Sequence, residues 1–433
     1  MFSHMGAQGR RKAHVEGDLK RTVTPAQGVA LYVGAVVGTG VLVLPGTAAS
    51  LAGPASVLAW AFVSVLGVPL ALTFAALAGR YPDAGGVATF TSRAFGPAWG
   101  AVVGWFYFFA SATALSLGPL IGAYYAAGPL GLGRGGTFLL GAAMLALAVA
   151  SNCGGLRVSG RVQLLLSGCV ALLLLAATAV SVPRMSLENW TPFVPGGWGA
   201  VGRVAVLLIF AVFGWEAIAQ LSAEFENPER DVPRSTFLSV GVIALLYVGV
   251  AAAVVGTSTY GNTAVNRVAV ASLIGNAMGA RVGAAASFMA LVITLATVNA
   301  YVAATSRLGY ALARDGAFPG WFAALNTGGV PVRAVLAVGG YAACGMLLSY
   351  AVGWGPEDLL AVPTSLGLAT YVVGTAAGVK LLAGWSRRLA AAAFLMCLAM
   401  MPFAGIFVVL PLAVAMAALL YRRLTSPGPR STP

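Results

Sequence analysis

Runs of about 20 apolar residues recur along the whole chain, and each is long enough to cross a hydrocarbon core about 30 Å thick. Hydrophobic residues make up 59% of the sequence and charged residues 9%, which excludes a water-soluble globule of this length. Because lipid offers the backbone no hydrogen bonds, runs of this length predict helices, and we expect an all-α membrane protein of about 12 transmembrane helices. The expected spans cover about residues 26–51, 55–79, 97–127, 136–151, 161–182, 199–224, 235–256, 282–310, 333–351, 358–382, 387–402 and 404–421.

Positive charges are distributed unevenly between the loops that join these spans. Counted from an N-terminus inside the cell, the inner loops and both tails hold most of the 25 Lys and Arg residues. The cations on the outer side are Arg134, Arg184, Arg203, Arg267 and Arg281. Inner loops of membrane proteins carry an excess of cations, so we expect a multi-pass protein of the inner (cytoplasmic) membrane with both termini in the cytoplasm. The net charge of +13 therefore belongs to short loops at the membrane and indicates no nucleic-acid partner.

Two expected spans are interrupted at corresponding places in the two halves of the chain. The first contains Gly38-Thr39-Gly40, and the sixth contains Phe213-Gly214-Trp215-Glu216. Unwound backbone survives inside a membrane only around a ligand or a wet cavity, and paired breaks of this kind indicate the substrate site of a transporter. Five spans counted from each break predict two inverted repeats, at about residues 25–182 and 199–382.

The first break suits the carboxylate of an amino acid. Unwinding at Gly38–Gly40 would free the N–H groups that open the second half-helix, at the positive end of its dipole. Carbonyl groups released near residues 35–37 and 210–213 could accept hydrogen bonds from an ammonium group. The alternative is that the glycines only permit close helix packing, which is the preferred interpretation for Gly34.

The interrupted spans and three further segments resemble the amino acid–polyamine–cation (APC) superfamily of transporters. These segments are Arg80-Tyr81-Pro82-Asp-Ala-Gly85-Gly86 after the second span, the run from Glu224 to Arg234 after the sixth, and Ser306 to Pro319 at the end of the eighth. The pattern is most similar to bacterial exporters of neutral amino acids such as methionine and the branched-chain set. The resemblance covers nearly all of residues 25–421.

The resemblance implies a LeuT-type 5+5 inverted repeat with discontinuous helices 1 and 6. A single transmembrane transporter domain would then cover residues 25–421, with two extra spans at 387–421. A cytoplasmic arm at residues 1–24 and a cytoplasmic tail at 422–433 would flank it. Phe210 matches the family's aromatic gate position on helix 6, and the Glu216 position serves gating and coupling in the family. The boundary at Met401 and Pro402 leaves open whether the last two spans are two helices or one kinked helix.

The scarcity of charged residues within the expected spans predicts the class of substrate. Glu216 is the only acid deep in an expected span, and no Lys or Arg lies near the middle of one. Because an unpaired buried charge is costly, neutral substrates are favoured. The candidate substrate-binding residues are Val37, Gly38, Thr39, Gly40, Phe210, Phe213, Gly214 and Asn299. Trp105, Tyr107 and Trp215 could also line the pocket, although simple packing explains these aromatic residues equally well.

Glu216 is the candidate coupling residue, with Trp215 beside it at the gate. Desolvation would raise the pKa of a carboxyl group there, which suits a proton relay; a protonated Glu that only caps the broken helix is the alternative. The fifth span lacks the Lys that many sodium-independent relatives carry, so that mechanism does not transfer. Thr294 and Thr297 could in principle bind sodium, but no metal site is assigned.

We therefore expect a secondary active transporter, an exporter of neutral amino acids driven by proton antiport, acting as a monomer or homodimer in the lipid bilayer. Uptake or exchange by the same fold is the alternative, and a sensor of that fold would look the same in sequence. A major-facilitator transporter is disfavoured by the break in the sixth span. An enzyme is not expected, because both His residues lie in the N-terminal tail and no hydrolase motif occurs. No cofactor or metal is expected, and the cysteines lack CxxC spacing.

Overall fold

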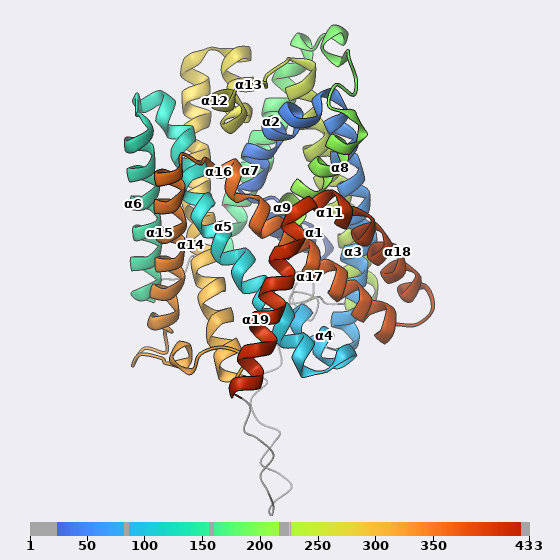
Figure 1. The fold of residues 1–433 in the computed structure, drawn as a ribbon. Helices are drawn as coiled ribbons and strands as arrows, with labels where there is room; N and C mark the ends of the chain where they lie inside the picture. Colours follow the sequence, from blue (N-terminus) through green and yellow to red (C-terminus); the bar gives the residue numbers. More distant parts are fainter. Residues whose placement is uncertain (1–23, 82–85, 156–159, 216–224, 226, 426–433) are drawn as a thin grey trace, which may run out of the picture.

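A computed structural model describes residues 24–81, 86–155, 160–215, 225 and 227–425 (Figure 1). Throughout this part of the chain the regular structure is helical. The first half contains α1 (Pro25–Val36), α2 (Gly40–Ala52), η1 (Gly53–Ala55), α3 (Ser56–Arg80), α4 (Gly86–Phe95), α5 (Pro97–Leu130), α6 (Arg134–Cys153) and α7 (Gly160–Ser181). The remainder contains η2 (Val182–Arg184), η3 (Leu187–Trp190), α8 (Gly197–Leu207), α9 (Ile209–Val212), α11 (Pro228–Gly256), α12 (Thr263–Arg267), α13 (Ala269–Met278), α14 (Ala280–Arg314), η5 (Gly320–Ala323), α15 (Val332–Val352), α16 (Pro356–Leu359), α17 (Ala361–Leu381), α18 (Gly384–Met400), η6 (Met401–Val408) and α19 (Val409–Thr425).

The first span is divided into two helices, as the sequence predicts. Thr24 and Gln27 form a capping box that starts α1, and Pro25 occupies its first turn, where no N–H partner is needed. The helix stops at Val37, whose backbone (φ −77°, ψ 82°) is not helical, and α2 starts at Gly40. The break therefore lies at residues 37–39, at the predicted place.

The second break follows α9. Phe213 is extended (φ −70°, ψ 116°), and Gly214 has φ +141°, a conformation that side chains rarely adopt. The coupling candidate Glu216 lies outside the described residues, as do residues 217–224. The start of this break is therefore confirmed at the predicted position.

Within the described residues, nine helical segments are long and apolar enough to cross a membrane. The expected number of about 12 is not confirmed. Gly40–Arg80, which contains both α2 and α3, counts as one segment, and α1 and the α8–α9 segment are each too short to cross alone. One of the nine, Gly384–Thr425, contains the last two expected spans. Gly405, with φ +58° and ψ −134°, separates α18 from α19, so this part of the chain forms two helices.

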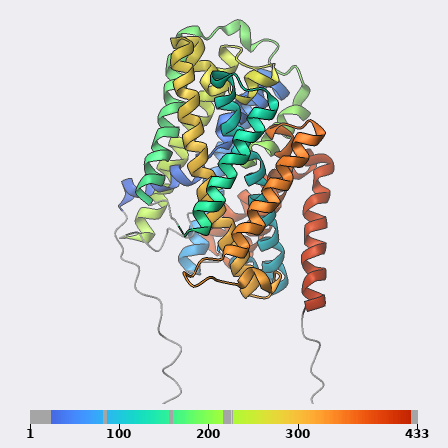
Figure 2. The same cartoon turned by 90° about the vertical axis from the view of Figure 1, so that its left-hand side faces the viewer.

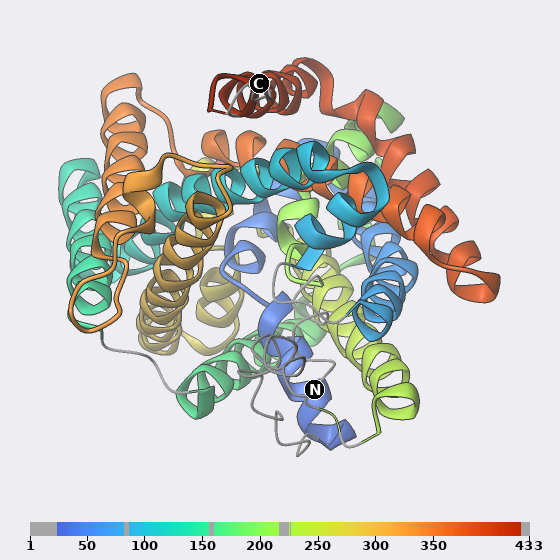
Figure 3. The same ribbon diagram turned by 90° about the horizontal axis from the view of Figure 1, so that it is seen from below.

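The helices form a bundle with two distinct ends. Figure 1 shows α12 and α13 at its upper end, and α4 and the end of α19 at its lower end. The loop after α11 therefore contains two short helices, α12 and α13. In Figure 2, α6 and α15 run beside each other along one side of the bundle. Seen from below, α19 lies at the rim, next to α5 (Figure 3).

The upper end of the bundle is tightly packed around α12. A Cβ atom added to Gly46 of α2 would lie 2.5 Å from the carbonyl oxygen of Asn266, so α12 rests directly on the α2 backbone. Arg267 of α12 forms an ion pair with Glu357 of α16, and its guanidinium lies 4.4 Å from the centre of the Tyr124 ring. Burial alone would lower the pKa of Arg267, but the hydrogen bond and negative charge of Glu357 raise it above its ordinary value. This pair ties α12 to α16, directly before α17.

We predict that Glu357→Gln destabilises the fold by about 1–3 kcal/mol, because Arg267 loses a charged hydrogen-bond partner in a largely buried setting. Thermal unfolding of the purified protein measures the effect. Arg314→Ala is the matched control. The side chains of Arg314 and its partner Asp315 are 65% and 64% exposed, and exposed ion pairs contribute little to stability. Equal losses in the two variants would contradict a stabilising role for the α12–α16 pair.

Candidate functional site

The N-terminal end of α2 offers unpaired hydrogen-bond donors. The backbone N–H groups of Thr39, Gly40 and Val41 make no hydrogen bond to any described residue. The first N–H groups of a helix have no partner within it, and here the residues before them are unwound. Thr39 is buried, with 8% of its surface exposed. Buried donors at the positive end of a helix form a site that a carboxylate can satisfy.

A cavity opens beside these donors. Its empty space totals about 430 Å³, part of it open to the surroundings. Both breaks contribute to its wall, together with α5 and α14. The lining residues are Val36, Gly38, Thr39, Gly40, Ala114, Leu115, Gly118, Phe210, Ala211, Phe213, Thr297, Val298 and Tyr301. None of these side chains is charged.

Two phenylalanines of the second break cover the cavity. The Phe210 ring lies against Gly40, where an added Cβ atom would be 2.8 Å from Cδ1 of the ring. Phe213 stacks on Tyr107 of α5, with ring centres 5.1 Å apart, and also contacts Tyr371 of α17, at 5.7 Å. Both predicted aromatic residues therefore line the cavity.

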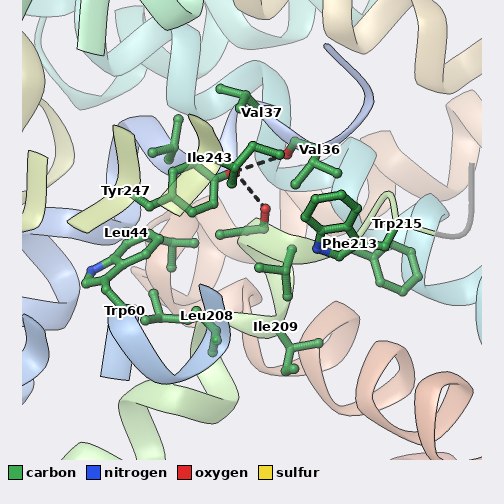
Figure 4. Packing of buried hydrophobic residues seen from close by; sticks show 14 of the residues in the cluster. Val36, Val37, Leu44, Trp60, Leu208, Ile209, Phe213, Trp215, Ile243 and Tyr247 are labelled. Atoms are coloured by element: carbon green, nitrogen blue, oxygen red, sulfur yellow. Dashed lines mark hydrogen bonds between the residues drawn. The ribbon is translucent and has the colours of Figure 1, made fainter. Parts of the chain in front are cut away.

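Hydroxyl groups from neighbouring helices satisfy several carbonyls freed by the breaks. Tyr247 of α11 lies 3.1 Å from the carbonyl oxygen of Val36 and 2.8 Å from that of Ala211 (Figure 4). Tyr371 donates to the carbonyl of Val212 at 2.9 Å. The carbonyls expected to receive an ammonium group are thus partly engaged by the protein itself. Sequence reasoning did not identify these tyrosines, because a lone Tyr in an apolar span has no distinctive pattern.

The two breaks touch each other at Gly214. A Cβ atom added there would lie 2.5 Å from the carbonyl oxygen of Ala35. Only glycine combines this close approach with a positive φ. Gly214 therefore holds the second break against the end of α1 rather than lining the cavity.

Three other candidates lie apart from the cavity lining. Asn299 accepts a hydrogen bond from Nδ2 of Asn152 at 2.9 Å, so its side chain is directed toward α6. Trp215 packs against Gly67 of α3. Trp105 donates to the carbonyl of Ala317 at 2.7 Å, near the lower end of the bundle.

Val37 is buried in the break itself and carries no lining surface. The α14 residues Thr297, Val298 and Tyr301 take the place expected for Asn299. The Thr297 hydroxyl donates to the carbonyl of Ile293 in its own helix, as that of Thr294 does to Ala290. No group of His, Cys, Asp or Glu suited to a metal ion occurs among the described residues.

A larger cavity lies near the upper end, between α5, α6, α12 and α13, with about 940 Å³ of empty space that is partly open to the surroundings. It includes two cations, but both are engaged. Arg134 donates to four carbonyls at the end of α15, namely those of Ser349, Tyr350, Gly353 and Trp354. Arg267 is paired with Glu357. Both cations of this cavity are therefore already engaged by the protein itself.

Comparison with known proteins agrees with this geometry. The crystal structure of MhsT in complex with L-phenylalanine superposes with a TM-score of 0.59 at 13% identity, over 90% of this chain and 100% of that one. This similarity confirms the predicted LeuT-type fold.

Among sequence relatives, the uncharacterized amino acid permease YecA of Bacillus subtilis is 34% identical, over 94% of this chain and 96% of its own length. The L-methionine/branched-chain amino acid exporter YjeH of Escherichia coli is 29% identical, over 89% and 92%, and the branched-chain amino acid permease BcaP of Bacillus subtilis is 29% identical, over 70% of each chain. Residues 26–431 match the profile of the family described as amino acid permease, so this multi-pass membrane protein belongs to the amino acid permease family of the APC superfamily.

Proposed function

We propose that this chain is a secondary active transporter of neutral amino acids in the cytoplasmic membrane, with both termini inside the cell. The observation that carries this proposal is that the N–H groups of Thr39, Gly40 and Val41 have no hydrogen-bond partner among the described residues and adjoin an uncharged cavity. The donors suit the carboxylate that every amino acid carries. The uncharged wall disfavours a substrate whose side chain brings a further charge.

The substrate side chain would lie between Phe210, Phe213 and the α14 residues. Apolar and aromatic walls suit methionine, leucine, isoleucine and valine. The E. coli relative is named for methionine and branched-chain export, and the B. subtilis permease BcaP for branched-chain substrates. We favour export, since the match to the named exporter extends over more of the chain. Uptake or exchange through the same site is the second candidate.

We predict that methionine, leucine, isoleucine and valine outcompete lysine and glutamate at least about tenfold. The reason is that an unpaired buried charge costs more than the roughly 1.4 kcal/mol of a tenfold ratio. Competition against labelled leucine in proteoliposomes measures the ratio, with both directions of flux followed. If lysine or glutamate competed better than the neutral set, the pocket assignment would be incorrect.

We predict that Gly40→Val reduces transport to background while the protein still inserts. A valine side chain there would displace the Phe210 ring and cover the donors at the start of α2. Gly241→Val is the matched control, because a Cβ atom at this exposed position of α11 meets nothing within 4 Å. Normal flux through the Gly40 variant would reject the carboxylate site.

Proton antiport through Glu216 is the proposed energy source, on the sequence argument that it is the one acid deep in an expected span. Glu216→Gln keeps the size and hydrogen-bonding capacity of the side chain but cannot carry a proton. We expect this variant to bind substrate yet lose acceleration by an imposed pH gradient in vesicles. Unchanged pH dependence would exclude Glu216 as the relay and leave a capping role or substrate exchange.

A further inference from the structure

The hydroxyl of Tyr247 forms hydrogen bonds to both breaks. Its hydroxyl oxygen lies 3.1 Å from the Val36 carbonyl at the end of α1 and 2.8 Å from the Ala211 carbonyl in α9 (Figure 4). The ring is fully buried, and Trp60 packs edge-on against it with centres 5.1 Å apart. The hydroxyl is therefore held at a fixed point between the two half-helices.

Without the Tyr247 hydroxyl, the Val36 and Ala211 carbonyl groups would lose a hydrogen-bond donor. Both carbonyls belong to the C-terminal ends of short helices, where the helix dipole is negative. Two such ends facing each other in an apolar region repel, and a buried carbonyl without a donor costs about 1–3 kcal/mol. A tyrosine hydroxyl has one proton, which it can give to either carbonyl in turn.

Tyr247 acts from behind the cavity wall. Val36 and Ala211 both line the cavity, whereas Tyr247 does not. A ligand in the cavity therefore cannot take over the position of the hydroxyl. The hydroxyl sets the distance between the two breaks. Because Val36 and Ala211 line the cavity, this distance also sets the width of the cavity that a ligand meets.

We propose that Tyr247 is a positioning residue that holds the two breaks together and thereby preassembles the pocket for the substrate's ammonium group. This inference rests on the proposed function, since it concerns how the same site recognises an amino acid. A ligand that uses both breaks benefits from the preassembled junction, because it does not bear the cost of bringing them together. A ligand that uses only the α2 donors does not depend on the junction.

The test compares leucine with 4-methylpentanoate, which is leucine without its amino group, as inhibitors of labelled amino acid transport. In Tyr247→Phe we expect the preference for leucine over 4-methylpentanoate to fall at least about tenfold, equivalent to about 1.4 kcal/mol. Tyr125→Phe is the matched control. Its hydroxyl is also buried and donates to a span-1 carbonyl, that of Leu42 at 2.7 Å, but it bonds only one carbonyl, inside α2, so the preference should be unchanged.

Replacement of Tyr247 by 4-aminophenylalanine keeps a donor at the same point and should restore the preference. If the Phe variant fails to reach the membrane, Trp60→Phe loosens the packing that fixes the hydroxyl and should lower the preference in the same direction. An equal loss of affinity for both compounds, an unchanged preference or a higher one would overturn the inference. If the unaltered protein handles no amino acid, the proposed function fails instead, and the two failures are distinguishable.

Discussion

Backbone hydrogen bonding in an apolar environment is the constraint on which this structure depends. Each unpaired backbone group in hydrocarbon costs several kcal/mol, yet the chain unwinds at residues 37–39 and again from Phe213. Hydroxyl groups from α7, α11 and α17 reach these breaks: Ser167 donates to the Gly34 carbonyl, Tyr247 lies between those of Val36 and Ala211, and Tyr371 donates to that of Val212. The surrounding bundle therefore makes broken helices tolerable.

At the two breaks, the backbone groups that have hydrogen-bond partners are carbonyls, and those without partners among the described residues are N–H groups. Carbonyls at the ends of α1 and α9 receive donors from the protein, while the N–H groups at the start of α2 receive none from the described residues. The open donors could therefore bind an anion, and an uncharged cavity adjoins them. A zwitterion with an apolar side chain meets both conditions, with its carboxylate at α2 and its ammonium near the carbonyls of the two breaks. This asymmetry is the structural basis of the proposed substrate class.

The parts of this arrangement that sequence could predict are those with a local signature. Glycines within apolar runs predicted the positions of both breaks. Phe210 and Phe213 were predicted to line the cavity because they lie beside the second break. The pairing of Asn299 with Asn152 depends on how α14 packs against α6, which no local pattern records. Tyr247 was missed for the same reason, since its role exists only once α11 crosses both breaks. The number of crossing helices also depends on where helices bend and join, as at Gly405.

The central claim is that the amino acid binds between the two breaks, with its carboxylate at the start of α2. A cryo-electron microscopy or crystal structure of the protein with bound leucine tests this most directly. The account predicts ligand density in the cavity of Phe210 and Phe213, with the carboxylate within hydrogen-bond distance of the Thr39, Gly40 and Val41 N–H groups. Density instead in the larger cavity beside Arg134 and Arg267, with the α2 donors still open, would contradict it.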